Sequence, residues 1–135
     1  MDLFSNQVMI ALVKELDAGA LRQRVLANNI ANVNTPDFKK STVEFDSLLK
    51  QALDREPVEM ITTDPRHFGV KPSLAELKPE VLLNKATTMR TDGNNVDIDE
   101  EMANLAANSM QYQAVAKELS ERYSGLSYVI SGGRR

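Results

Sequence analysis

A seven-residue hydrophobic repeat in the last third of the sequence most constrains the fold. Its positions are separated by alternating steps of four and three residues: Ile98, Met102, Leu105, Ser109, Tyr112, Ala116, Leu119, Tyr123, Leu126 and Ile130. Such a repeat is typical of a helix that packs along another helix, whereas an ordinary surface helix has a shorter and wider apolar face. The sequence therefore predicts a C-terminal helix over 97–131 with a coiled-coil-like seam.

Both ends of this helix carry capping signals. Asp97 is a good N-cap, and Glu100 three residues later makes a variant of the capping box. Asp99 and Glu101 add negative charge at the positive end of the helix dipole, and Gly132-Gly133 follows its last turn. The acidic cluster lacks the ligand spacing of an EF-hand calcium loop. We therefore interpret it as helix capping and predict no metal site.

A second helix-period pattern runs from Leu3 to about Val33. It has the same alternation of steps: Met9, Leu12, Leu16, Gly19, Gln23, Leu26, Ile30 and Val33. Gly19 weakens the helix, although a glycine also lets a neighbour come close. At about 1.5 Å per residue, both terminal helices would be roughly 45 to 50 Å long. Similar lengths at opposite ends of the chain predict an antiparallel hairpin.

The N-terminal helix is predicted to end before Pro36. Proline cannot continue the helix and pushes Thr35 toward extended geometry. Asparagines crowd this end of the helix, where side-chain amides can bond exposed backbone groups. They are Asn28, Asn29, Asn32 and Asn34. We interpret them as a helix cap and turn, a role compatible with contact to a neighbouring subunit.

The middle of the chain, residues 34–96, differs from both ends in composition and pattern. A short helix is predicted over Val43–Leu53, with Phe45, Leu48, Leu49 and Ala52 on one face. Prolines then recur at Pro57, Pro65, Pro72 and Pro79. Short strands are predicted among the turn residues, at Val58–Thr62, Phe68–Lys71 and Ala86–Thr91. This connector has too few large apolar residues for a core of its own.

The predicted fold is therefore mostly α and forms a single unit, residues 1–135. Long N- and C-terminal helices, 3–33 and 97–131, pack as an antiparallel coiled-coil-like hairpin. A short helix and an extended proline-rich connector with small β elements join them.

Composition and motifs exclude several function classes. The net charge is -3 with no basic stripe, so we expect no nucleic-acid partner. There is no cysteine, which removes disulfides and thiolate metal sites. The only histidine, His67, has Asp64 nearby but no nucleophile or phosphate loop. We therefore predict no catalytic residue, no cofactor and no small-molecule substrate, and hence no enzyme.

The hydrophobicity of the N-terminal sequence limits how the chain could be targeted within the cell. Its longest apolar run, Val8 to Val13, is too short for a secretory signal or a membrane span. We expect a chain that is either cytoplasmic or exported by a route that leaves its N-terminus uncut, without direct membrane insertion.

The terminal helices carry more apolar surface than one hairpin can bury. Leu21, Val25, Val115 and Val129 lie outside both seams. A monomer should therefore be only marginally stable and should gain stability by packing against copies or relatives of itself. The predicted assembly interface comprises Met9, Leu12, Leu16, Leu26, Ile30, Ile98, Met102, Leu105, Tyr112, Leu119, Tyr123, Leu126 and Ile130. Its buried tyrosines would need hydroxyl partners, which favours a junction of several helices.

Two segments resemble a known family. Residues 27–39, ANNIANVNTPDFK, resemble the N-terminal signature of the bacterial flagellar rod, hook and hook-filament junction proteins. Residues 92–102, DGNNVDIDEEM, are similar to the closing segment of the short proximal rod proteins of that family. The matching positions are Asn28, Asn29, Asn32, Thr35, Pro36, Phe38, Asn95, Val96 and Asp97. Asp37 stands where the family usually has glycine, so the turn is either of type I or strained with positive φ.

The resemblance implies a structural subunit of the proximal rod of the flagellar basal body, which transmits motor torque. It further implies a periplasmic location reached through the flagellar type III export apparatus, without a cleaved signal peptide. The implied partners are other rod proteins, copies of the chain, and the MS-ring and export-gate end of the motor. The alternative function is a cytoplasmic coiled-coil adaptor or secretion chaperone, which would use the same seam to bind a partner. Such a protein would be a stable helical dimer.

Overall fold

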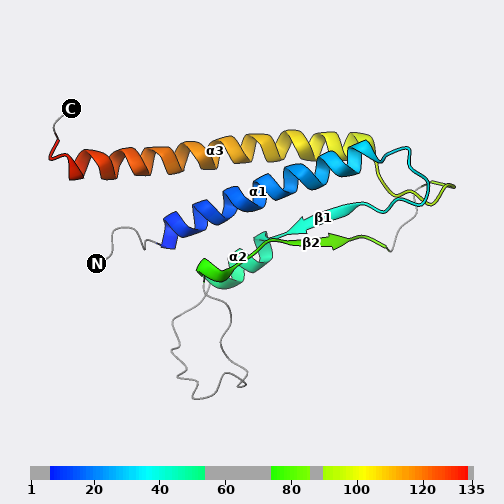
Figure 1. The fold of residues 1–135 in the computed structure, drawn as a ribbon, viewed down its shortest axis with the longest axis horizontal. Helices are drawn as coiled ribbons and strands as arrows, with labels where there is room; N and C mark the ends of the chain where they lie inside the picture. The colour runs from blue at the N-terminus through cyan, green and yellow to red at the C-terminus, as the bar shows by residue number, and fades with distance from the viewer. Residues whose placement is uncertain (1–6, 54–73, 86–89, 134–135) are drawn as a thin grey trace, which may run out of the picture.

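A computed structural model describes residues 7–53, 74–85 and 90–133 of the chain. The described chain is mostly helical (Figure 1). In order, its elements are helix α1 (Gln7–Ala31), strand β1 (Ser41–Glu44), helix α2 (Asp46–Leu53), the short 3-10 helix η1 (Leu74–Glu76), strand β2 (Glu80–Leu83) and helix α3 (Ile98–Ile130).

The two long helices form the predicted antiparallel hairpin. They lie side by side in Figure 1, and the end of α1 meets the start of α3 where Asn29 bonds Glu101. Further along the pair, Gln111 of α3 bonds Glu15 of α1. α3 has 33 residues and α1 has 25, so α3 continues past the beginning of α1. The predicted start of the first helix at Leu3 lies outside the described residues.

The predicted caps of α3 are confirmed. Asp97 has extended geometry, and its carboxylate accepts from the N–H groups of Asp99, at 2.9 Å, and Glu100, at 3.4 Å. At the other end, Gly132 and Gly133 have φ values of 63° and 75°. The Glu100 carboxylate, however, lies 2.9 Å from Lys40 Nζ. Asp97 therefore caps α3, while the Glu100 side chain pairs with Lys40 instead of completing the predicted variant of the capping box.

Two geometries were expected for the turn after α1, a type I turn or a strained turn with positive φ at Asp37. The structure has the strained one. Asp37 has φ = 58°, which excludes a type I turn, since that turn needs negative φ at both central positions. Aspartate tolerates this left-handed conformation less readily than glycine. The Asp37 N–H donates to the carbonyl of Asp92 at 2.9 Å. A contact with a distant segment thus helps to hold the turn.

The prediction of a helix over Val43–Leu53 was wrong at its beginning. Ser41–Glu44 instead forms β1, which pairs antiparallel with β2, so that Ser41 lies opposite Leu83 and Glu44 opposite Glu80. The β-branched Thr42 and Val43 favour a strand once a partner strand is available. The helix starts at Asp46, whose carboxylate suits the first turn. Neither strand was predicted from the sequence.

Most of the predicted connector lies outside the described residues. This applies to Val58–Thr62, Phe68–Lys71 and the first three connector prolines, while Pro79 directly precedes β2. Of Ala86–Thr91, only Arg90 and Thr91 are described. They form a bend and a turn rather than the predicted strand, because the chain reverses there toward Gly93.

A small apolar cluster lies on the side of α1 that faces away from α3. Ala18 of α1, Phe45 and Leu77 are its buried members. The side chains packed around them come mainly from α2, as its predicted apolar face requires, and they are Leu48, Leu49, Ala52 and Leu74. α1 therefore lies between α3 on one side and the small α2 and β elements on the other (Figure 1). Within the described ranges, no helix has the length and apolarity needed to cross a membrane.

Candidate assembly surface

Helix α3 turns a partly polar face toward α1. Glu101 and Asn108 are its two buried residues, and they lie seven positions apart. Between and beyond them lie half-buried or partly exposed positions with the same alternating steps: Leu105, Tyr112, Val115, Leu119, Arg122 and Leu126. Residues that recur every 3.5 positions form a line along one side of a helix, and that line faces the partner helix. The line from Glu101 to Leu126 is therefore the seam through which α3 packs on α1 of the same chain.

The predicted C-terminal seam is divided between two adjoining lines. Four of its members, Leu105, Tyr112, Leu119 and Leu126, belong to the line that faces α1. Its other large members lie on an adjoining line that is exposed: Ile98, Met102, Tyr123 and Ile130. Met102 is 52% exposed and Tyr123 is 49% exposed. We call Ile98, Met102, Tyr123 and Ile130 the α3 stripe.

The predicted N-terminal seam lies mostly inside the hairpin. Met9 and Leu26 are buried, and Leu12, Leu16 and Ile30 are half-buried. Gly19 is also buried, and a Cβ there would lie 3.1 Å from a ring carbon of Tyr112. This glycine therefore admits the Tyr112 ring to the surface of α1, so the close neighbour is a side chain and not the backbone that the sequence led us to expect.

The interface between α1 and α3 is joined by polar side chains. Asn108 Nδ2 donates to the carbonyl of Gly19 at 3.0 Å, and Arg22 Nη1 donates to Asn108 Oδ1 at 3.4 Å. Burial raises the pKa of the Glu15 carboxyl, the Asp46 charge adds to the rise, and Arg22 opposes it. Because the pKa of the Glu15 carboxyl is higher in the folded chain, the folded chain binds this proton more tightly than the unfolded chain does. Glu15 therefore adds to the free energy of unfolding at low pH, and this contribution is lost as pH rises through the folded pKa.

The family-motif residues gather where the hairpin closes. Asn29, Asn95 and Val96 are buried, Asn32 and Phe38 are half-buried, and Asn28, Thr35 and Pro36 are exposed. Asn32 Nδ2 donates to the carbonyl of Asn28 at 2.8 Å, and Thr35 Oγ1 donates to Asn32 Oδ1 at 3.2 Å. The two ends of the chain that carry the resemblance thus meet in one structural unit.

Asn29 joins three elements at this point. Its Nδ2 donates to the Ser41 carbonyl at 2.8 Å and to Glu101 Oε2 at 2.9 Å. The Ser41 N–H donates back to Asn29 Oδ1 at 3.0 Å. Lys40 Nζ lies 3.7 Å from Glu101 Oε1, which provides a positive charge beside the buried carboxylate. A buried carboxylate needs such partners, because its desolvation is otherwise costly.

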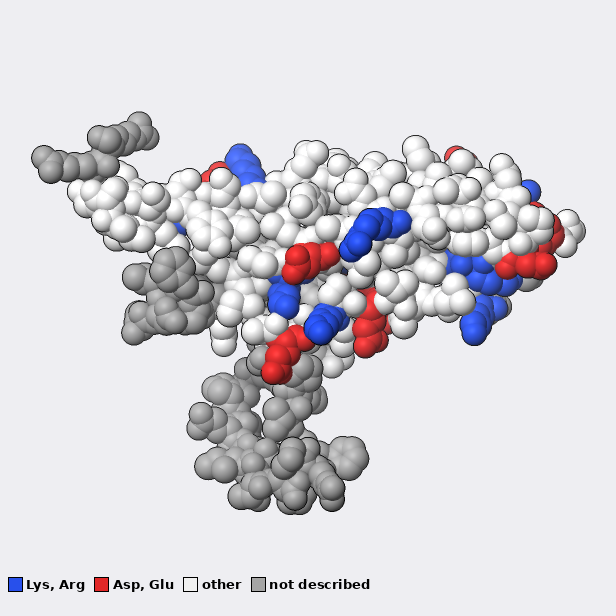
Figure 2. All heavy atoms as spheres, in the orientation of Figure 1, with Lys and Arg blue, Asp and Glu red and all other residues white. Residues whose placement is uncertain are grey.

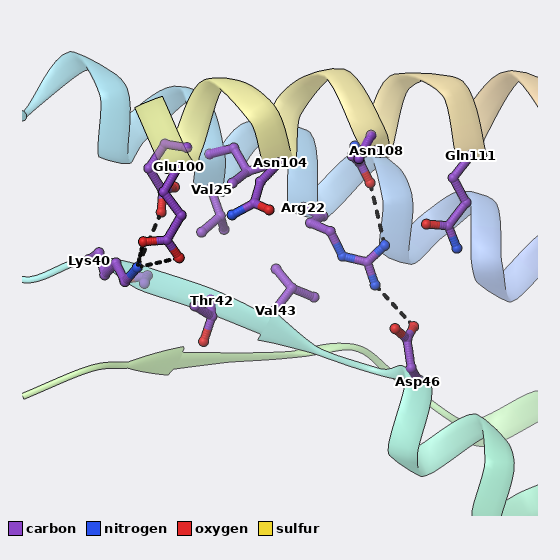
Figure 3. Close-up of a pocket in the computed structure, with 14 residues that line it drawn as sticks. Arg22, Val25, Lys40, Thr42, Val43, Asp46, Glu100, Asn104, Asn108 and Gln111 are labelled. Atoms are coloured by element: carbon purple, nitrogen blue, oxygen red, sulfur yellow. Dashed lines mark hydrogen bonds and ion pairs between the residues drawn. The ribbon is translucent and has the colours of Figure 1, made fainter. Parts of the chain in front are cut away.

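A cavity of about 280 Å³ lies between α1, β1 and α3. Figure 3 shows Lys40 and Glu100 at one end and Arg22 and Asp46 at the other. Lys40 Nζ lies 2.9 Å from Glu100 Oε2, and Arg22 Nη2 lies 3.1 Å from Asp46 Oδ1. The charges at both ends are therefore already paired. On the face drawn in Figure 2, acidic and basic side chains of the described residues likewise lie beside one another rather than separated by sign.

Sequence reasoning missed several of these residues. Glu101, Asn108, Arg22 and Lys40 were not named as packing positions, because the search followed apolar residues. A second four-three alternation, beginning at Glu101 and Asn108, is present in the sequence and would have indicated a polar seam. Asn94 appeared only within the segment DGNNVDIDEEM and was given no role, although it is fully buried.

Comparisons with known proteins agree on one family. A family model described as "Flagella basal body rod protein" matches residues 16–39, the second half of α1 and the turn after it. The flagellar basal body rod protein FlgB of Bacillus subtilis (strain 168) is 37% identical over 134 residues, covering 99% of this chain and 100% of that protein. FlgB of Borreliella burgdorferi is 34% identical over 120 residues, covering 85% of this chain and 89% of that protein.

A third relative gives the same result. FlgB of Escherichia coli (strain K12) is 34% identical over 126 residues, covering 87% of this chain and 88% of that protein. None of these three relatives is named as an adaptor or a chaperone. The matches extend over both terminal helices and the connector between them. The chain therefore belongs to the family of flagellar basal body rod proteins FlgB.

Proposed function

We propose that the chain is a structural subunit of the proximal rod of the flagellar basal body, where it assembles through its two terminal helices and transmits motor torque. Membership of a family of structural rod proteins makes it a basal body component and not an enzyme. In the proposal, residues 1–135 act as one axial unit. Its partners are copies of the chain, other rod proteins, and the MS-ring and export-gate end of the motor.

The observation that carries the assembly mode is the exposed α3 stripe. Fully burying a large apolar side chain contributes about 1.5 to 3 kcal/mol, so four such residues in one line represent substantial unused stabilisation. Their line adjoins the one that packs on α1, and a helix with two adjoining seams can contact two other helices. A helix of a neighbouring subunit would complete such a bundle through coiled-coil-like contacts.

The proposed location is the periplasm, reached by type III export without a cleaved signal peptide. A hairpin with few fully buried apolar residues suits this route, because it has only a small apolar core to lose when the chain is extended. Packing of the α3 stripe in the rod would then supply the stability that the single subunit lacks.

We expect Met102→Asp to abolish swimming when it replaces the native gene in the source bacterium. A charge placed in a helix–helix seam must be desolvated without a partner, which is costly enough to exclude the subunit from the rod. Swimming in soft agar and the amount of the variant in purified basal bodies would be measured. Because Met102 is half exposed in the subunit, the secreted level should stay near that of the native chain.

Met110→Asp is the matched control. Met110 is a methionine of the same helix and is 66% exposed, but it lies eight residues from Met102, about 80° around the helix. This variant should swim and assemble at near-native levels. Normal motility of Met102→Asp, or equal loss in both variants, would contradict the assigned stripe.

A further inference from the structure

The turn that follows α1 is bonded by a residue that lies far away in the sequence. Asn94 is fully buried, and its Nδ2 donates to the carbonyls of Asn32, at 3.0 Å, Val33, at 3.1 Å, and Thr35, at 2.9 Å. Carbonyls at a helix end are usually satisfied by residues close in sequence. Two of these three do accept locally, Asn32 from the Thr35 N–H at 3.0 Å and Thr35 from the Phe38 N–H at 3.3 Å. The side-chain donor that all three share comes from 59 to 62 residues later.

The same loop also bonds the segment that leads into β1. Asn95 Oδ1 accepts from the Lys40 N–H at 2.7 Å, and Asn95 Nδ2 donates to the Asn84 carbonyl at 2.9 Å. Lys39 Nζ donates to the Gly93 carbonyl at 2.6 Å. These bonds, together with the one from the Asp37 N–H, join the backbone of residues 32–40 to loop 92–95 at several points.

Loop 92–95 is connected just as directly to the start of α3. Asn94 Oδ1 accepts from the Val96 N–H at 2.7 Å, and Val96 is buried. Asp97 then caps the helix. Asn94 therefore uses one side-chain amide to close the turn after α1 and to orient the residue before the α3 cap. Among the described residues at this end of the hairpin, the buried apolar side chains are Leu26 and Val96, and Ile30, Val33 and Phe38 are half-buried.

We propose that loop 92–95 is a latch that orders the end of α1 and the start of α3 in one step. Until the loop is in place, the carbonyls of Asn32, Val33 and Thr35 lack the Asn94 donor, and the Asp37 N–H lacks the Asp92 carbonyl. Only the two backbone bonds within the turn, from the Thr35 and Phe38 N–H groups, then remain to hold Asp37 in its left-handed conformation. The latch thereby couples the two family signatures and fixes the register of the hairpin. This inference does not rest on the rod function, since it concerns the single subunit.

Native-state hydrogen exchange on the full-length chain tests the latch without any mutation. Amide protection would be compared for the N–H groups of Asp37 and Lys40, before β1, and of Val96 and Glu101, around the start of α3. A single opening step predicts protection factors that agree within about threefold and fall together as urea is added. Independent protection of the two segments, or no protection at either, would overturn the proposal.

A pair of isosteric variants adds a second test. Asn94→Asp keeps the shape of the side chain but replaces its donor with carboxylate oxygen facing three carbonyls. We expect opening to increase by roughly 10- to 100-fold at both segments, as for other buried polar groups left without partners. Asn34→Asp, exposed in the same turn, should change opening less than about twofold. A large effect of Asn94→Asp confined to residues 92–95 would contradict the coupling.

Discussion

Replacing Glu101 with alanine is expected to lower the free energy of unfolding by about 2 to 3 kcal/mol. The side chain of Glu101 is only 2% exposed, and it accepts from Asn29 Nδ2 at 2.9 Å. Its removal leaves a cavity and takes a buried acceptor from Asn29, the residue that also bonds Ser41. Urea unfolding followed by the helical circular dichroism signal would measure the loss.

Glu100→Ala is the control for this prediction. Glu100 bonds the same Lys40, but its side chain is 49% exposed. Exposed ion pairs typically contribute less than about 1 kcal/mol, so this variant should be within that range of the native chain. Equal losses from the two neighbouring glutamates would show that the buried network around Asn29 does not stabilise the hairpin as described.

Gly93→Ala is expected to destabilise the chain by about 2 to 3 kcal/mol. Gly93 has φ = 80°, a conformation that alanine adopts only with strain. A Cβ at Gly93 would also meet the carboxylate of Asp37, but that side chain is exposed and can move aside, so the backbone strain carries the expected loss. The same unfolding measurement applies.

Gly125→Ala is the corresponding glycine control. Gly125 lies inside α3, and nothing approaches within 4 Å of the position of its missing Cβ. Alanine there should raise stability by about 0.5 to 1 kcal/mol, because glycine is a poor helix residue. A neutral or stabilising effect of Gly93→Ala would contradict the described packing of the loop.

The helices and their ends could be predicted from the sequence because their signals are local. The repeat from Ile98 determined the extent of α3, and Asp97 and Gly132 marked its boundaries through capping chemistry that involves only nearby residues. Pro36 similarly placed the end of α1 within a few residues. Where the signal was a short stretch such as Thr42-Val43, the prediction failed, because strand formation depended on the distant β2.

The face of α3 that packs on α1 could not be chosen from hydrophobicity alone. The predicted and the observed seams of α3 share Leu105, Tyr112, Leu119 and Leu126, and the apolar residues favour the predicted one, which runs through Met102. The chain instead turns Glu101 and Asn108 inward, where Asn29 and the Gly19 carbonyl satisfy them. The four-three alternation through Glu101 and Asn108 marks such a line in the sequence, but the partners that satisfy it are identified only in the structure.

The central claim is that the α3 stripe packs against another subunit in the rod. The most direct measurement places a small diazirine-bearing amino acid at position 102 or at position 110, followed by illumination of assembled basal bodies and mass spectrometry of the products. We expect position 102 to link the chain to a copy of itself or to another rod protein at least several times more efficiently than position 110. Equal linkage from the two positions, or stronger linkage from 110, would contradict the claim.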